Sequence, residues 1–119
     1  MRFLMISNPD PSAAPPSPER MAAIGQLTEE MVRAGVILDT GGIQAAGRQV
    51  RYAAGKFTVM DGPFTEAKEL VGGYAIVNAA SMDEALALSR RFFEVAGDGS
   101  GEVRRLFGGD ELAPGCVPE

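Results

Sequence analysis

The apolar residues of this chain recur in two helical patterns separated by shorter, strand-like segments. Between residues 18 and 34 and between residues 82 and 95, apolar side chains repeat every three to four positions, which places them on one face of a helix. The two stripes are Met21, Ile24, Leu27, Met31 and Val32, and then Ala85, Leu88, Phe92 and Val95. Ser17 precedes the first pattern, and Ser81 stands three residues before Glu84, as in a capping box. The pattern predicts two amphipathic helices.

Six shorter segments have the length and apolar content of β-strands. They are residues 2–7, 36–39, 48–53, 56–60, 73–79 and 102–107. Ala54-Gly55 is a turn between the third and fourth strands, so we expect a hairpin there. Residues 8–18 contain five prolines and are expected to form an exposed loop, and the glycine-rich residues 41–47 to form a flexible link.

The order of these elements predicts an α+β chain. Without the inserted hairpin it is βαββαβ, the pattern of the ferredoxin-like fold with its antiparallel sheet. Both helices of that fold cover one face of the sheet and leave the other uncovered. Apolar side chains remain for that face, among them Tyr74, Ile76, Phe57 and Val59. A second copy is the simplest cover, so the pattern favours a homodimer with two sheets facing each other.

The composition excludes several kinds of site. The chain has 119 residues, about one domain, and contains no histidine and a single cysteine, Cys116. The absence of histidine therefore excludes Ser-His-Asp and Cys-His catalytic arrangements. One cysteine without histidine also excludes the usual zinc sites. We expect no metal and no cofactor. Residues 108–119, which include Cys116, are expected to form a flexible C-terminal tail after a domain of residues 1–107.

Net charge and hydropathy limit which classes of partner and which cellular location we expect. Sixteen acidic residues against eleven basic ones give a net charge of −5, which would repel a nucleic-acid backbone. No apolar run approaches the roughly 20 residues that span a membrane. We therefore expect a cytoplasmic protein with no direct nucleic-acid partner and no membrane segment.

The most informative stretch is Asp61-Gly-Pro-Phe-Thr-Glu-Ala-Lys-Glu69, followed shortly by Gly72-Gly73-Tyr74. Asp-Gly-Pro is typical of a turn, in which the carboxylate accepts hydrogen bonds from nearby backbone N–H groups. If the preceding strand continues, Asp61 lies on the same face as Phe57 and Val59. Asp61 is then either a clamp on the backbone or a site residue with a perturbed pKa. The acidic residues here lack the spacing of a calcium-binding EF-hand loop.

This motif closely resembles the DGPF-type branch of the YCII-related family, and the resemblance spans most of residues 1–107. It implies a ferredoxin-like chain in a dimeric α/β-barrel. The wider superfamily includes isomerases, monooxygenases and dehydrochlorinase-like enzymes. A histidine–aspartate pair proposed as the active site of some relatives has no counterpart here, because this chain has no histidine. Some DGPF-type proteins occur beside extracytoplasmic-function sigma factors, which implies a functional link to such a factor.

Two functions follow as hypotheses. In the first, the chain is a homodimeric small-molecule-binding or regulatory module without catalysis. In the alternative, it is a histidine-free lyase- or isomerase-type enzyme that acts on a small anionic compound in the dimer cleft, with Asp61 as general acid/base. Arg104 or Lys68 would hold the anion. The expected ligand-binding residues are Asp61, Phe64, Glu66, Lys68, Glu69, Tyr74 and Arg104.

Overall fold

The structure is a computed structural model that describes residues 1–44, 46–61 and 72–108. The chain is α+β, with antiparallel sheets and two helices in the order that the sequence predicts. In chain order the elements are β1 (Arg2–Pro9), α1 (Pro18–Arg33), β2 (Ile37–Ile43), β3 (Arg48–Ala53), β4 (Lys56–Asp61), β5 (Gly72–Asn78), α2 (Met82–Ala96) and β6 (Gly99–Leu106). Neither helix in these ranges has both the length and the apolar character that crossing a membrane requires.

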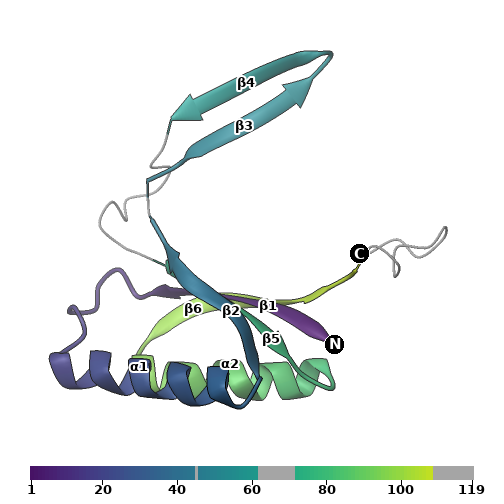
Figure 1. Cartoon of the computed structure of the whole chain (residues 1–119). Helices are drawn as coiled ribbons and strands as arrows, with labels where there is room; N and C mark the ends of the chain where they lie inside the picture. The colour runs from purple at the N-terminus through teal and green to yellow at the C-terminus, as the bar shows by residue number, and fades with distance from the viewer. Residues whose placement is uncertain (45, 62–71, 109–119) are drawn as a thin grey trace.

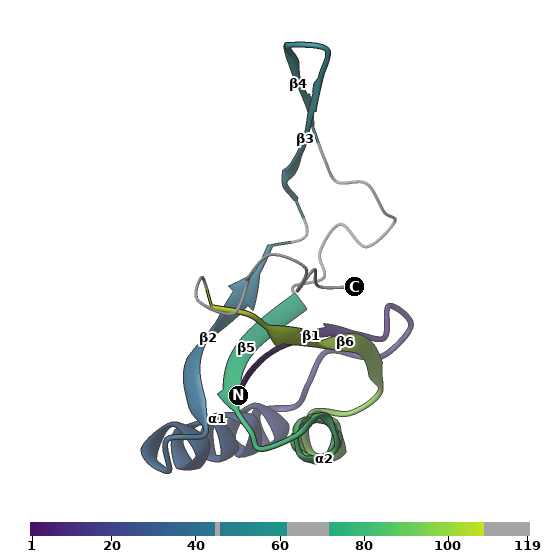
Figure 2. The same cartoon turned by 90° about the vertical axis from the view of Figure 1, so that its right-hand side faces the viewer.

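Four strands form one antiparallel sheet in the order β2-β5-β1-β6. The central strand β1 pairs with β5 on one side and with β6 on the other. Both helices lie on the same side of this sheet (Figures 1 and 2). This arrangement is compatible with a ferredoxin-like fold, and it leaves one sheet face without a helix.

Both helices begin at the predicted serine caps. The side chain of Ser17 accepts a hydrogen bond from the backbone N–H of Arg20 at 3.1 Å, and Pro18 occupies the start of α1. Ser81 accepts from the backbone N–H of Glu84 at 3.2 Å. The Glu84 carboxylate reaches back to the backbone N–H of residue 80, completing a box-like cap one position before the usual one.

The core lies between the sheet and the helices. Phe3 of β1 is only 1% exposed, and it packs with Val77 of β5 and with Ala85 of α2. Smaller contributions come from half-buried side chains on the same side of the sheet, namely Met5, Ile37, Ala75 and Val103. Alternate residues of a strand point to opposite faces, so these positions identify the helix-facing side of every strand.

Strands β3 and β4 form a separate hairpin that projects away from the sheet on the side opposite the helices (Figures 1 and 2). Its turn is the predicted Ala54-Gly55, and both residues have positive φ angles, 51° and 76°. Two consecutive positive φ angles are typical of the type I′ turn, whose twist suits a two-residue hairpin. Ala54 therefore adopts a conformation that costs a non-glycine residue free energy.

Three strands are at least two residues longer than the sequence predicted, and β4 is longer by one residue, Asp61. β1 extends to Pro9 and β6 starts at Gly99 because these two residues are cross-strand partners. β2 runs through the glycines at 41–42 to Ile43, a segment that we expected to be a flexible link. Its pairing with β5 supplies hydrogen bonds that local sequence does not reveal. Of the expected tail, residues 109–119 lie outside the described residues.

We expect the Phe3→Ala substitution to lower the free energy of unfolding by about 3–5 kcal/mol, because it leaves a cavity in the core. Urea unfolding followed by circular dichroism measures this. Leu86→Ala is the matched control: Leu86 lies on α2 with its side chain 48% exposed, and we expect a change within about 0.5 kcal/mol. Equal costs for the two variants would contradict this assignment of the core.

Candidate functional site

The sheet face that points away from the helices is the candidate site, and we call it the open face. Two neighbouring rows of cross-strand partners define it. In strand order these rows are Asp39, Ile76, Leu4 and Arg104, and then Gly41, Tyr74, Ile6 and Glu102. Among the described elements, the helices pack on the opposite side and the hairpin pairs only with itself. The open face therefore has no covering layer within the described chain.

Asp39 and Tyr74 form a polar pair at the β2 edge of the open face. The Tyr74 hydroxyl donates a hydrogen bond to Asp39 Oδ2 at 3.0 Å, and the backbone N–H of Thr40 donates to Asp39 Oδ1 at 3.0 Å. The Tyr74 ring lies over Gly41, where a Cβ atom would come within 2.9 Å of Tyr74 Cε1. The hydrogen bond to Asp39, with smaller contributions from desolvation and from the charge of Asp39, raises the pKa of Tyr74 above its ordinary value.

A bulge in β2 directs Asp39 to this face. Ile37 pairs with Val77 and points toward the helices, but the next paired residue is Asp39, opposite Ile76, and the register shifts between them. Strict alternation from Ile37 would have turned Asp39 toward the helices. The extra residue, Leu38, reverses that direction, as bulges commonly do at functional edges. Sequence reasoning missed Asp39 because it treated this segment as a regular strand, in which nothing marks the bulge.

Arg104 and Glu102 form a second polar pair at the opposite, β6 edge. Arg104 Nε donates to Glu102 Oε1 at 2.7 Å, and the Arg104 side chain is 71% exposed. Ion pairs this exposed contribute little to stability, typically about 0–1 kcal/mol. Arg104 can therefore exchange Glu102 for an anionic ligand at small cost.

The floor between the two pairs is apolar. It consists of Leu4, Ile6 and Ile76, all half-buried, on the two central strands of the sheet. Neighbouring strands lie about 4.8 Å apart, so Asp39 on β2 lies roughly 14 Å, and Tyr74 on β5 roughly 10 Å, from the polar pair on β6. This width accommodates a small organic molecule, with an apolar surface beneath it and polar groups at both ends.

The predicted site residues are placed as follows. Tyr74 and Arg104 both lie on the open face, whereas Asp61 lies at the end of the hairpin strand β4. Asp61 lies on the same face of β4 as Phe57 and Val59, as expected. Its side chain is 83% exposed and is ion-paired with Arg48 at 3.2 Å. The other four predicted residues, Phe64, Glu66, Lys68 and Glu69, lie outside the described residues.

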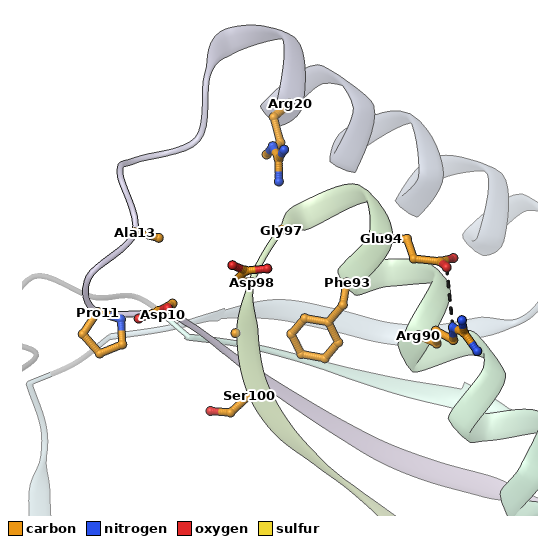
Figure 3. A pocket seen from close by; sticks show the side chains of 11 residues that line it. Asp10, Pro11, Ala13, Arg20, Arg90, Phe93, Glu94, Gly97, Asp98 and Ser100 are labelled. Carbon is orange, nitrogen blue, oxygen red and sulfur yellow. Dashed lines mark ion pairs between the residues drawn. The ribbon is translucent and has the colours of Figure 1, made fainter.

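A wide hollow of about 1080 Å³ lies elsewhere, where the loop after β1 meets the end of α2 (Figure 3). Arg20 extends into it toward Gly97, beside Asp98. Two of its carboxylates already have partners. Asp10 accepts hydrogen bonds from the backbone N–H and the hydroxyl of Ser12, which lower the pKa of Asp10, and Glu94 is ion-paired with Arg90. The hollow is lined by both signs of charge, with Arg20 and Arg90 beside Asp10, Glu94 and Asp98.

No cluster of three or more acidic or cysteine side chains within the described ranges is arranged to hold a metal ion. The chemistry available on the open face is that of a phenol, two carboxylates and a guanidinium.

Comparisons with known proteins give the following similarities. Residues 1–108 match the model of the YCII-related domain. The chain is 44% identical over 62 residues to the uncharacterised protein R00369 of Rhizobium meliloti (strain 1021), and the alignment covers 51% of this chain and 50% of that protein. The chain thus spans about half the length of this curated relative. Among solved structures, it is similar to CutA from Xylella fastidiosa, with a TM-score of 0.48 and 11% identity, over 91% of this chain and 86% of that one.

We expect Asp39→Ala to lower the pKa of Tyr74 toward its ordinary value, because the acceptor that favours the protonated phenol is lost. The absorbance of the phenolate during a pH titration measures this. The chain has two tyrosines, so the titration is done in a Tyr52→Phe background in which Tyr74 is the only one. Asp98→Ala is the control and should leave the titration unchanged.

The dependence of folding stability on pH gives a second measurement of the same pair. Because the pKa of Tyr74 is raised in the folded state, its hydrogen bond contributes stability below the ordinary tyrosine pKa, and this contribution is lost as the pH rises through the raised value. Asp39→Ala should remove this part of the pH dependence. An unchanged Tyr74 titration in Asp39→Ala would contradict the pairing.

Proposed function

The chain belongs to the YCII-related family, and we propose that it is a homodimeric small-molecule-binding module whose ligand lies on the open face. The observation that supports this most directly is the combination of an apolar floor, Leu4, Ile6 and Ile76, with a polar pair at each edge. Ligand sites typically have this composition: mostly apolar walls and a few polar groups that fix orientation.

The proposed dimer supplies the missing walls of the site. A sheet face open to water cannot enclose a ligand, whereas two open faces opposed across a two-fold axis form a cleft with a floor and a roof of the same composition. Packed sheets lie about 10 Å apart. Side chains fill most of that spacing, and the Tyr74 ring already lies over Gly41, so a ligand would lie over the apolar floor between the two polar pairs.

The hairpin supports the same assembly. One of its faces bears the cross-strand pairs Val50–Val59 and Tyr52–Phe57, and all four side chains are exposed, Tyr52 by 73%. An isolated two-stranded hairpin is at best marginally stable in water. We propose that the second copy covers this face, which would also withdraw the neighbouring Arg48–Asp61 ion pair from solvent.

The proposed ligand is a small organic anion with an apolar body. Arg104 would hold the anionic group by charge-assisted hydrogen bonds, and the apolar floor would contact the body. Tyr74 is the second group that can contact the ligand, since a phenol can donate and accept at the same time. The link to an extracytoplasmic-function sigma factor remains a prediction, in which such a ligand would be the signal.

The enzymatic alternative requires a buried Asp61 carboxylate, and the described chain does not bury it. A carboxylate acts as a general acid near neutral pH when burial favours its protonated form. In the single chain the Asp61 side chain is exposed and ion-paired with Arg48. The alternative therefore depends on covering of the hairpin by a second copy, and the binding function needs fewer assumptions.

We expect the wild-type chain to elute with a mass of about 25 kDa, twice the 12.5 kDa of one chain, in size-exclusion chromatography with light scattering. Ile6→Glu should give a folded monomer, because two charges would be buried at the centre of the proposed interface. Met21→Glu, on the exposed surface of α1, is the control and should remain dimeric. A monomeric wild type, or a folded and dimeric Ile6→Glu, would overturn the proposed interface.

Benzoate serves as a probe for the ligand class, with the isosteric neutral benzamide as its control. We expect benzoate to bind the wild type more tightly than benzamide does. Arg104→Gln should weaken benzoate binding by about tenfold or more, because a charge-assisted hydrogen bond is lost. Titration followed by nuclear magnetic resonance measures both affinities. Arg90→Gln removes a guanidinium that is ion-paired on α2 and should have no effect. Equal affinities in wild type and Arg104→Gln would contradict the role of Arg104.

A further inference from the structure

A cavity of about 210 Å³ lies between the helix-facing side of the sheet and the two helices, on the opposite side of the sheet from the open face. We call it the interlayer cavity. Residues of both helices line it, among them Leu27, Met31, Leu88 and Phe92. Its base is formed by β1 and β5, where small residues, Ser7, Gly73 and Ala75, replace the large side chains found elsewhere in the core.

Gly73 accounts for much of the space. Its φ angle is not in the left-handed region, and among the described residues the nearest atoms to a Cβ built on it would be Gly41 O at 3.5 Å and Ser7 Oγ at 3.6 Å, which are ordinary contacts. Neither the backbone conformation nor a close neighbour therefore requires glycine here. A glycine inside a strand nevertheless costs about 0.5–1 kcal/mol relative to alanine.

The preceding glycine shows the contrast. A Cβ atom on Gly72 would lie 2.6 Å from Asn8 Oδ1 and 3.0 Å from Ser7 O, so the close approach of β1 explains the glycine at that position. At Gly73 the visible consequence of the missing side chain is the empty space above it. Glycine at position 73 therefore lowers the stability of β5 relative to alanine, and it leaves the space of the cavity unfilled.

The lining determines which molecules the cavity can accept. None of the described residues that line it carries a charge, so an ion would be desolvated without compensation from them. The hydroxyls of Thr28 and Thr40 already donate to the carbonyls of Ile24 and Tyr74, each at 2.8 Å. Within the part of the chain that the structure describes, the hydroxyls of Ser7 and Ser89 have no hydrogen-bond partner. They can therefore bind a polar group of a ligand.

We propose that the interlayer cavity binds a small uncharged molecule with an apolar or aromatic body and one hydroxyl or carbonyl group. An engineered apolar cavity of about 150 Å³ is known to bind benzene, so 210 Å³ suits a ring of that size with one substituent. This site is independent of the proposed dimer, because all of its walls come from one chain. It also differs in ligand class from the open face, for which we propose an anion.

Benzene and phenol are the probes that test this site, because they differ by one hydroxyl. We expect both to raise the midpoint of thermal unfolding of the full chain, by about 5 °C or more at ten times the dissociation constant. We expect phenol to bind several-fold more tightly than benzene, and this difference to vanish in the Ser7→Ala/Ser89→Ala double variant. An absent shift with both probes overturns the proposal, and equal affinities in the wild type overturn the role of the two serines.

Gly73→Val tests the location. The new side chain occupies the space without a clash at its Cβ atom, so we expect a folded protein whose unfolding midpoint no longer responds to benzene. Gly25→Val is the matched control: it makes the same change on α1, where a Cβ atom would meet nothing within 4 Å, and it should keep the wild-type response. A folded Gly73→Val that still responds to benzene overturns the assignment.

A second measurement makes the test independent of that variant. Bound benzene should show nuclear Overhauser contacts with the methyl groups of Leu27 and Leu88 in the wild type. Their absence during saturable benzene binding would place the probe elsewhere. Benzoate binding should not change in Gly73→Val, and benzene binding should not change in Arg104→Gln. Failure of one site is thereby distinguished from failure of the other.

Discussion

The pairing of β1 with both β5 and β6 is the constraint on which the rest of the structure depends. It satisfies the backbone of the central strand on both edges and fixes a register in which Phe3 lies opposite Val77. A slip of one residue would exchange the two faces of the strand and bring Leu4 into the core in place of Phe3. Burial of Phe3 and Val77 opposes that slip, and the same burial sets the composition of the open face.

The step from Gly73 to Tyr74 shows how one strand serves two sites. Consecutive strand residues point to opposite faces, so the Tyr74 side chain points to the open face, where its hydroxyl is bonded to Asp39. Gly73 borders the interlayer cavity on the other side, where Tyr74 also contributes to the lining. The Thr40 hydroxyl, which bonds to the Tyr74 carbonyl, joins β2 to β5 at this point. Both proposed ligands would thus depend on the same local pairing of β2 with β5, although they differ in charge and lie on opposite sides.

Much of the fold was predictable because its signals are local. The serine caps and the Ala54-Gly55 turn each depend on a few neighbouring residues, and the structure has them where the sequence predicts. The first helical stripe is confirmed only in part: Leu27 and Met31 are buried, but Met21 and Val32 are 56% and 50% exposed. The family was predictable for a different reason, since the Asp61-Gly-Pro-Phe motif is long and specific. The extension of β2 was not predictable, because pairing with a distant strand makes a glycine-rich segment into a strand.

The candidate site was less predictable than the fold for the same reason. Tyr74 and Arg104 were identified from the sequence, but the partner of Tyr74 depends on a bulge at Leu38 that alternation alone does not show. The interlayer cavity left no sequence signal at all, since Gly73 resembles its neighbour Gly72 until the surroundings of each are compared. Properties that depend on contacts between distant segments leave no local pattern in the sequence.

The hairpin gives the strongest physical argument that the single chain is not the whole assembly. Its four exposed apolar side chains cannot be buried by a two-stranded ribbon, and a ribbon gains too little from its own pairs to offset the cost of ordering its backbone. It also bears three cations and one carboxylate in a chain whose net charge is −5, so the remainder of the molecule is more acidic than the average. In the proposed dimer, a second copy would cover the apolar side chains of the hairpin, and the net negative charge of that copy would attract the hairpin's cations. Hydrophobic burial and charge attraction therefore favour the same partner, whereas a nucleic acid or an acidic protein would satisfy the hairpin alone and be repelled by the rest of the chain.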